Sequence, residues 1–149
     1  MRIVPASDQE CEELLERVPF GRLACALDNQ PYVVPVAFSY EPGHIYVFST
    51  VGKKIEWMRQ NPKVCLQVDE VGNRSSWTSV VVSGKYVELR EPQYTAEKER
   101  ARELLSESAQ WWTVPMAQRR EQADDISIHP VFFRIDIESM SGLRGIPEA

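Results

Sequence analysis

Histidine and cysteine are scarce in this chain of 149 residues, which limits the metal chemistry that it can perform on its own. It has two histidines, His44 and His129, and three cysteines. The cysteines (Cys11, Cys25 and Cys65) are far apart and form no CxxC pair, and Cys25 and Cys65 lie among apolar neighbours. Structural zinc sites need four cysteine or histidine ligands at close spacing, so no protein-only zinc site is expected. The cysteines are expected to be free thiols that pack as small core residues in a reducing compartment.

Clustered positive charge and long apolar runs are also lacking. The formal net charge is -5, and the two local basic clusters are Lys53–Lys54 and Arg119–Arg120. Because nucleic-acid binding needs grouped lysine and arginine side chains, no nucleic-acid partner is expected. No apolar run approaches the ~20 residues that a membrane-spanning helix requires. Acidic residues from Asp8 onward are not typical of a secretory signal, so we expect a cytoplasmic protein without membrane contact.

The composition and strand signals predict a single domain over residues 1–149. Hydrophobic residues make up 43% of the chain and charged residues 26%, as in ordinary globular proteins. Apolar and alternating segments predict six strands, at 22–27, 32–40, 44–50, 64–68, 77–89 and 131–138. Helices are predicted at 7–18, 53–60 and 95–108, and loops at 70–76 and 111–128. Because regular crossover helices do not separate the strands, we expect a mainly β (α+β) fold, an antiparallel barrel with flanking helices.

Local signals refine this prediction. Ser7 and Glu10 have the spacing of a capping box, which places the start of a helix at residue 7. Pro35 interrupts an apolar strand, and since proline has no N–H to donate, that point is expected to be an edge, a bulge or a place for another partner. Gly84 lies inside a long strand and predicts a bulge or bend that lets the sheet curve.

The most informative polar groups lie between the third predicted strand and the helix that follows it. The strand ends in Ser49 and Thr50, the chain turns at Gly52, and the helix opens with Lys53 and Lys54. Hydroxyls, backbone N–H groups, the positive end of a helix and ammonium groups are what a phosphate monoester binds. The upstream glycine of a Walker loop is missing. The alternative is an ordinary strand–turn–helix whose lysines are solvated.

Three other features are compatible with a flat aromatic ligand. A planar ring could approach the backbone at Pro35, although a tolerated proline in an edge strand explains it equally. The run Trp77, Thr78 and Ser79 could flank such a ring, or it could be a core tryptophan beside surface hydroxyls. Trp111–Trp112 could cover a ligand or a subunit boundary, or simply pack. No Ser–His–Asp arrangement stands out, which suits a cofactor that performs the chemistry itself.

Several motifs occur in an order that is specific when they are taken together. They are Gly21–Ala24, Val34–Phe38, Ile45–Thr50, Gly52–Lys54, Trp77–Val80 and Phe133–Gly142. In this order the chain resembles the FMN-binding split-barrel proteins related to pyridoxamine 5′-phosphate oxidase. It is most similar to the branch that includes the nitroimidazole-resistance proteins, from about Pro19 to Arg144.

The resemblance implies a six-stranded split β-barrel that forms a homodimer with FMN at the dimer interface. It places Pro35 and Val36 along the isoalloxazine ring. The other cofactor-binding residues that it implies are Ser49, Thr50, Lys53 and Lys54 at the phosphate and ribityl chain, and Trp77, Thr78 and Ser79 at the border of the flavin. Of the two lysines, Lys53 is expected to contribute more, because it lies nearer to the amide donors at the helix start.

Departures from the family pattern limit the expected activity. Phe48 occupies the position where nitroimidazole-resistance proteins commonly have a histidine, which argues against nitroimidazole reduction. The loop from Ser49 to Gly52 is one residue short, so the phosphate contacts could shift by one residue. The basic residues that hold pyridoxal phosphate have no evident equivalents, so vitamin B6 oxidation is not expected.

The sequence thus predicts an FMN-dependent oxidoreductase that takes electrons from a small donor, such as a reduced nicotinamide, and passes them to a small acceptor. Three alternatives remain open at this point. They are a non-catalytic flavin-binding or sensing module, a haem-binding split barrel that uses His44 or His129, and a deazaflavin-binding relative.

Overall fold

The computed structural model describes residues 1–107 and 130–148. Its strands are β1 (Arg2–Pro5), β2 (Phe20–Leu27), β3 (Gln30–Glu41), β4 (His44–Thr50), β5 (Lys63–Asn73), β6 (Ser76–Glu88) and β7 (Pro130–Ile146). Its helices are α1 (Asp8–Arg17), α2 (Lys53–Gln60) and α3 (Thr95–Glu107). None of these helices is long and apolar enough to cross a membrane.

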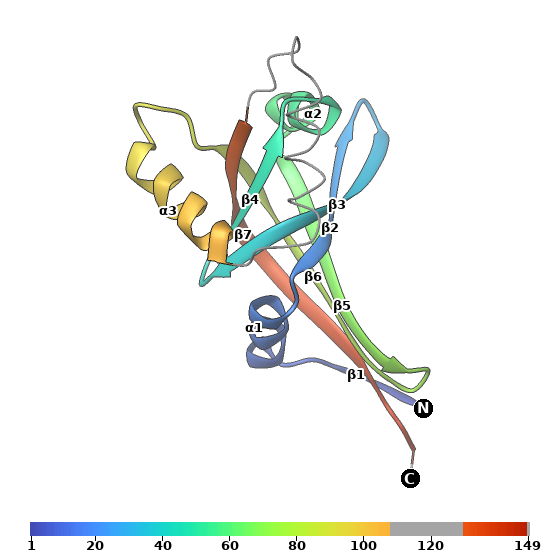
Figure 1. The fold of residues 1–149 in the computed structure, drawn as a ribbon. Helices are drawn as coiled ribbons and strands as arrows, with labels where there is room; N and C mark the ends of the chain where they lie inside the picture. The colour runs from blue at the N-terminus through green and yellow to red at the C-terminus, as the bar shows by residue number, and fades with distance from the viewer. Residues whose placement is uncertain (108–129, 149) are drawn as a thin grey trace, which may run out of the picture.

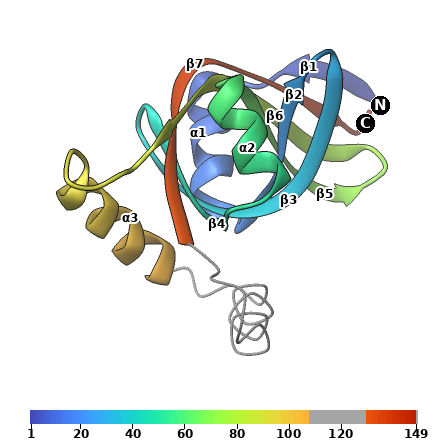
Figure 2. The same ribbon diagram turned by 90° about the horizontal axis from the view of Figure 1, so that it is seen from above.

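The strands form one antiparallel sheet in the order β1-β7-β4-β3-β2-β5-β6. Because β6 also pairs with β7, the six strands from β2 to β7 close into a ring, and β1 is attached to β7 outside it. Helices α1 and α2 lie at opposite ends of the ring, and α3 lies outside it beside β4 and β7 (Figures 1 and 2). The prediction of a mainly β, six-stranded antiparallel fold with flanking helices is confirmed.

The inside of the ring is apolar. Alternate residues of the six ring strands point inward, so that Leu23, Ile45, Leu66 and Phe133 are each 0% exposed. A smaller cluster around Tyr46, Leu89, Ala101 and Phe132 fills the space between α3 and the outside of the ring. Burial of these two sets of side chains is the main driving force for packing inside the ring and for packing of α3 against it.

Several local predictions are confirmed. Ser7 caps α1, and its backbone N–H donates in return to Glu10 Oε1 at 3.0 Å, which completes the capping box. The predicted strands 22–27 and 32–40 are joined by a turn with positive φ at Asp28 and Asn29. The register between β6 and β7 shifts at Gly84, where an added Cβ would collide with the Asp136 carbonyl, so the strands can approach only because this residue is glycine.

Other boundaries were wrong. β1 was not predicted, β5 continues through Val71 to Asn73 where a loop was expected, and β7 continues past residue 138 to Ile146. These extensions form an arm that projects from the ring (Figure 1). The side chains of β1 and of the end of β5 are mostly exposed, and those of β7 past residue 138 are mostly exposed or half-buried, so these segments lack the apolar alternation that marks a strand. Pairing of β1 with β7, and of β5 and β7 with β6, decides their conformation instead. The predicted loop 111–128, with Trp111–Trp112, lies outside the described residues.

Candidate functional site

Two lysines open α2 at one end of the ring. The helix begins immediately after Gly52, with no side chain capping it, and its first hydrogen bond runs from the N–H of Glu56 to the carbonyl of Gly52 at 3.0 Å. The N–H groups before Glu56 therefore have no partner within the helix and carry its partial positive charge. Lys53 and Lys54 add two full charges at the same place.

Lys54 is the more buried of the two. Burial lowers the pKa of its ammonium group, an effect that the nearby Cys25 thiol partly opposes. Burial likewise raises the pKa of Cys25, against the influence of both lysines. Across the described parts of the chain, no carboxylate forms an ion pair with Lys54. A half-buried cation without a counter-ion is a site that an anion would stabilise.

Lys53 has different surroundings. Its ammonium group lies 4.6 Å from the centre of the Tyr32 ring and 4.8 Å from that of Trp57. The two rings are 5.8 Å apart and inclined by 57°. Cation–π attraction therefore holds Lys53, whereas Lys54 makes no such contact with the aromatic residues of the described ranges.

The hydroxyl groups predicted with the lysines point elsewhere. Ser49 is 1% exposed, on the core side of β4, and its hydroxyl donates to the carbonyl of Thr50 at 3.3 Å. Thr50 points to the opposite side of the strand, where its partner in the register is Pro130. The structure thus places Lys53 and Lys54 at the helix start, and the side chains of Ser49 and Thr50 on opposite sides of β4.

Pro35 lies on the outer face of the ring. The register places Pro35, Arg22, Gln67 and Val81 in one row across β3, β2, β5 and β6. Val36 is 5% exposed and belongs to the core. Because neighbouring residues of a strand face opposite sides, only Pro35 of this predicted pair presents its side chain on the outer face.

A chain of polar contacts joins this row to Ser79. Gln67 Nε2 donates to Ser79 Oγ at 3.1 Å and to Asp69 Oδ2 at 2.9 Å. Arg22 Nη1 lies 3.3 Å from both Gln67 Oε1 and Asp69 Oδ2. The prediction from sequence missed Arg22, Gln67 and Asp69. The available signal was Gln67, a polar residue in an apolar strand, but its neighbours on β2 and β6 follow only from the register.

The other residues of the predicted site lie on the projecting arm. Trp77 packs its ring against Gly145, with Nε1 3.4 Å from Met1 Sδ. Thr78 is opposite Arg144 in the register and faces away from Ser79. The arm and α2 are at opposite ends of the chain's fold (Figure 1). Within one chain, the predicted residues therefore form separate groups.

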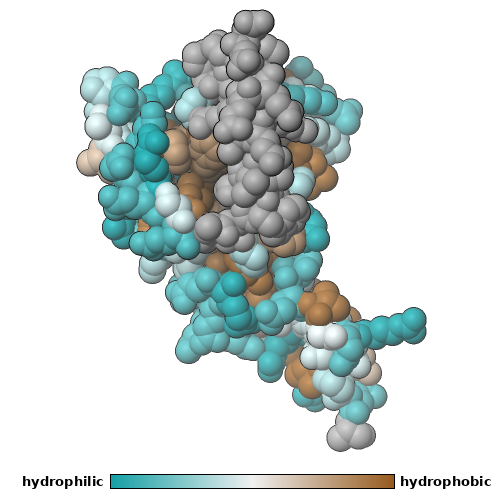
Figure 3. Space-filling model, viewed as in Figure 1, coloured by the Kyte–Doolittle hydropathy of each residue, from teal (hydrophilic) through white to brown (hydrophobic). Residues whose placement is uncertain are grey.

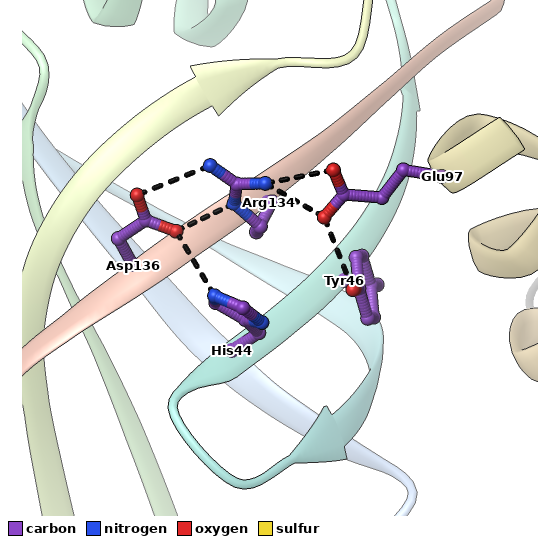
Figure 4. Close-up of polar contacts among 5 residues, drawn as sticks. All are labelled: His44, Tyr46, Glu97, Arg134 and Asp136. Carbon is purple, nitrogen blue, oxygen red and sulfur yellow. Dashed lines mark hydrogen bonds and ion pairs between the residues drawn. The ribbon is translucent and has the colours of Figure 1, made fainter. Parts of the chain in front are cut away.

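Beside α3, in contrast, the charged groups are paired with one another (Figure 4). Arg134 donates to both carboxylate oxygens of Glu97, at 2.7 and 2.8 Å, and to Asp136 at 2.5 Å. Tyr46 donates to Glu97 at 3.2 Å, and burial together with the Glu97 charge raises the pKa of Tyr46 to about 12. His44 Nε2 lies 3.6 Å from Asp136. This network attaches α3 to the ring.

A second paired cluster lies at the end of β6. Arg59 donates to Glu88 at 2.8 and 3.1 Å, and Arg90 and Tyr86 donate to it at 2.6 and 2.5 Å. Burial alone would raise the pKa of Glu88, but these hydrogen bonds outweigh it and lower the pKa to about 2. A pocket of about 310 Å³ opens beside the cluster, yet Glu88 and Arg90 in its wall are already paired with each other.

As for the alternative haem site, His44 already faces Asp136 (Figure 4), and His129 lies outside the described residues. Among the residues with described positions, no three histidine, cysteine, aspartate or glutamate side chains are grouped to hold a metal ion.

The closed ring of antiparallel strands, with a helix at each end, defines the split-barrel class of proteins. Residues 7–144 match the family model described as pyridoxamine 5′-phosphate oxidase, and the chain belongs to this family. The resemblance predicted from the sequence motifs is confirmed.

Individual relatives extend this assignment. An uncharacterized protein of Rhizobium meliloti (strain 1021) is 38% identical over 141 residues, covering 91% of each chain. The crystal structure of an FAD-binding protein from Mesorhizobium loti matches with a TM-score of 0.79 and 42% identity, covering 97% of this chain and 99% of the other. The structure of a candidate 5-nitroimidazole antibiotic resistance protein from Bacteroides thetaiotaomicron has a TM-score of 0.70 at 21% identity, covering 96% of this chain and 87% of that one, and so shows a shared fold.

Proposed function

We propose that this protein binds a flavin nucleotide through its FMN portion and acts as a flavin-dependent oxidoreductase on a small acceptor. The observation that carries the proposal is Lys54, a half-buried ammonium group at an uncapped helix start with no carboxylate partner in the described ranges. A phosphate at this point would supply the missing counter-ion and accept hydrogen bonds from the N–H groups at the start of α2. The family, and the FAD-binding relative from Mesorhizobium loti, support a flavin as the molecule that carries the phosphate.

The chain's own residues would hold and orient this cofactor, and the flavin supplies the electron-transfer chemistry when it is bound. Lys54 balances the phosphate charge. Arg22, Gln67 and Ser79 offer hydrogen-bonding groups on the outer face, where the polar edge of an isoalloxazine ring needs them. Pro35 lies on the same face, and its backbone nitrogen carries no N–H.

We further propose that the protein is a homodimer in which each flavin site is completed by the partner. Trp77 belongs to the arm and Lys54 to α2, and these two parts lie at opposite ends of the fold (Figure 1). In the proposed site a second copy of the chain brings one of the two groups to the other. Val33 on the outer face is 61% exposed, and the arm exposes Ile3 and Leu143 at 55% and 50%. Apolar side chains gather on this arm in Figure 3, as expected of a surface that another subunit covers.

Light scattering at micromolar concentration should therefore give twice the chain mass of 17.1 kDa. A monomer that binds flavin stoichiometrically would contradict the shared site.

The phosphate site is tested by comparing FMN with riboflavin, which differ only in the phosphate. We expect FMN to bind at least about tenfold more tightly, because a charge-assisted contact is worth about 1.5–3 kcal/mol. Lys54→Met should remove most of the difference, whereas Lys98→Met, on α3, should leave it unchanged. Equal binding of the two ligands by the parent protein would contradict the proposal.

Bleaching of bound flavin by a reduced nicotinamide under anaerobic conditions would separate an oxidoreductase from a flavin-sensing module.

A further inference from the structure

An aromatic surface adjoins the candidate phosphate site. Tyr32 of β3 and Trp57 of α2 are both half-buried, with ring centres 5.8 Å apart. Trp57 follows Lys53 by four residues, so the two side chains share one face of the helix. The Lys53 ammonium group lies within 5 Å of both ring centres, which shows that this surface accepts a positively charged group.

The two lysines are suited to more than one phosphate. Lys54 is half-buried and Lys53 is exposed, so one positive charge lies inside the site and the other lies nearer to solvent. A single phosphate at Lys54 would also have the N–H groups of the helix start. Lys53 is held by aromatic rings and, in the described residues, by no carboxylate, so a second phosphate can attract it without breaking an ion pair.

From these observations we propose that Tyr32, Lys53 and Trp57 form a subsite for the adenosine monophosphate half of a flavin dinucleotide, FAD. Lys53 turns from the rings to contact the second phosphate. The adenine takes its place and stacks on the Trp57 ring, with the inclined Tyr32 ring beside it, since aromatic side chains bind nucleobases through their faces. The inference deepens the proposed flavin binding and rests on it: the FMN half occupies the Lys54 end, and the adenosine half extends outward over α2.

The experiment compares the dissociation constants of FMN and FAD for the parent protein, Trp57→Leu and Trp57→Phe, measured by calorimetry so that the loss of indole fluorescence does not interfere. The parent should bind FAD about tenfold more tightly than FMN. Trp57→Leu should lower FAD affinity about tenfold and leave FMN affinity within about twofold. Trp57→Phe, which keeps an aromatic face, should retain most of the preference.

Three results would overturn the subsite while flavin binding itself stands: equal affinities of the parent for FAD and FMN, an equal loss of both in Trp57→Leu, or unchanged FAD affinity in that variant. Failure of the parent to bind either nucleotide would overturn the proposed function as well. FMN binding serves as the internal test of folding for each variant. If Trp57→Leu does not fold, Tyr32→Leu carries the comparison, and unchanged FAD affinity in that variant overturns the subsite.

Discussion

The two ends of α2 differ in whether their positively charged side chains are paired with carboxylates. In the last turn, Arg59 donates two hydrogen bonds to Glu88, which also accepts one from Arg90. In the first turn, Lys53 and Lys54 have no carboxylate partner among the residues whose positions are described. The helix is eight residues long, so paired and unpaired cations lie within about two turns of each other.

This difference separates charges that hold the fold from charges that are available to a ligand. Burying a charged group costs free energy unless a partner compensates for it. At Glu88 the partners come from α2 and β6, and at Arg134 they come from α3 and β7, so both clusters attach a helix to the ring. At Lys54 the described part of the chain supplies no such partner, and a bound anion can fill that role.

Removing a paired charge should therefore weaken the fold. Glu88→Gln should lower the free energy of unfolding by about 3 kcal/mol at pH 7, since the pKa of Glu88 is about 2 instead of the ordinary 4.5. Because the folded-state pKa is lowered, this stabilisation is complete above about pH 4.5 and is lost as the pH falls toward 2. Urea unfolding of the parent and the variant should thus differ strongly at pH 7 and converge in acid.

The matched control is Glu16→Gln on α1, an exposed carboxylate that makes no ion pair within the described residues, which should change stability by less than about 0.5 kcal/mol. FMN affinity of the folded Glu88 variant should equal that of the parent. Equal stability of Glu88→Gln and the parent at pH 7 would show that the cluster contributes nothing.

The sequence predicted the unpaired end of α2 better than the paired end. The helix bounds Lys53–Gln60 and the two lysines after Gly52 follow from local turn and helix signals, and the structure has these bounds. The pairing of Arg59 with Glu88 joins residues 29 positions apart and depends on how α2 packs on β6, which no local pattern encodes.

The same distinction explains the rest of the predicted site. Alternation along β3 already implies that Pro35 and Val36 face opposite sides, whereas the row from Pro35 through Arg22 to Gln67 requires the register of three strands. Strand pairing along the arm has no apolar signature, so its length could not be predicted. Ser49 was predicted to bind the phosphate from its residue type and spacing, whereas its burial in the core and its hydrogen bond to the Thr50 carbonyl follow only from the packing of β4.

Removing an unpaired charge should have the opposite effect to removing the charge of Glu88. It should change ligand binding and should not weaken the fold. Lys54→Met should lower FMN affinity about ten- to a hundredfold, the value of one charge-assisted contact. Its free energy of unfolding should stay the same or rise, because the folded state no longer buries an unpaired cation. Lys53→Met should change FMN affinity less than about threefold, since its ammonium group rests on Tyr32 and Trp57. This order reverses the expectation from the sequence, where proximity to the helix start favoured Lys53.

The pH dependence of FMN binding separates these roles. Burial lowers the pKa of Lys54, and a bound phosphate must raise it again, so binding favours the protonated lysine. The phosphate is fully ionised above about pH 7, so it contributes no further change there. FMN affinity should then fall with rising pH, beginning below the 10.5 at which an exposed lysine would titrate. Lys53→Met should keep this decline and Lys54→Met should abolish it. A decline that survives in Lys54→Met and disappears in Lys53→Met would assign the phosphate contact to Lys53, and the burial of Lys54 would then serve the fold alone.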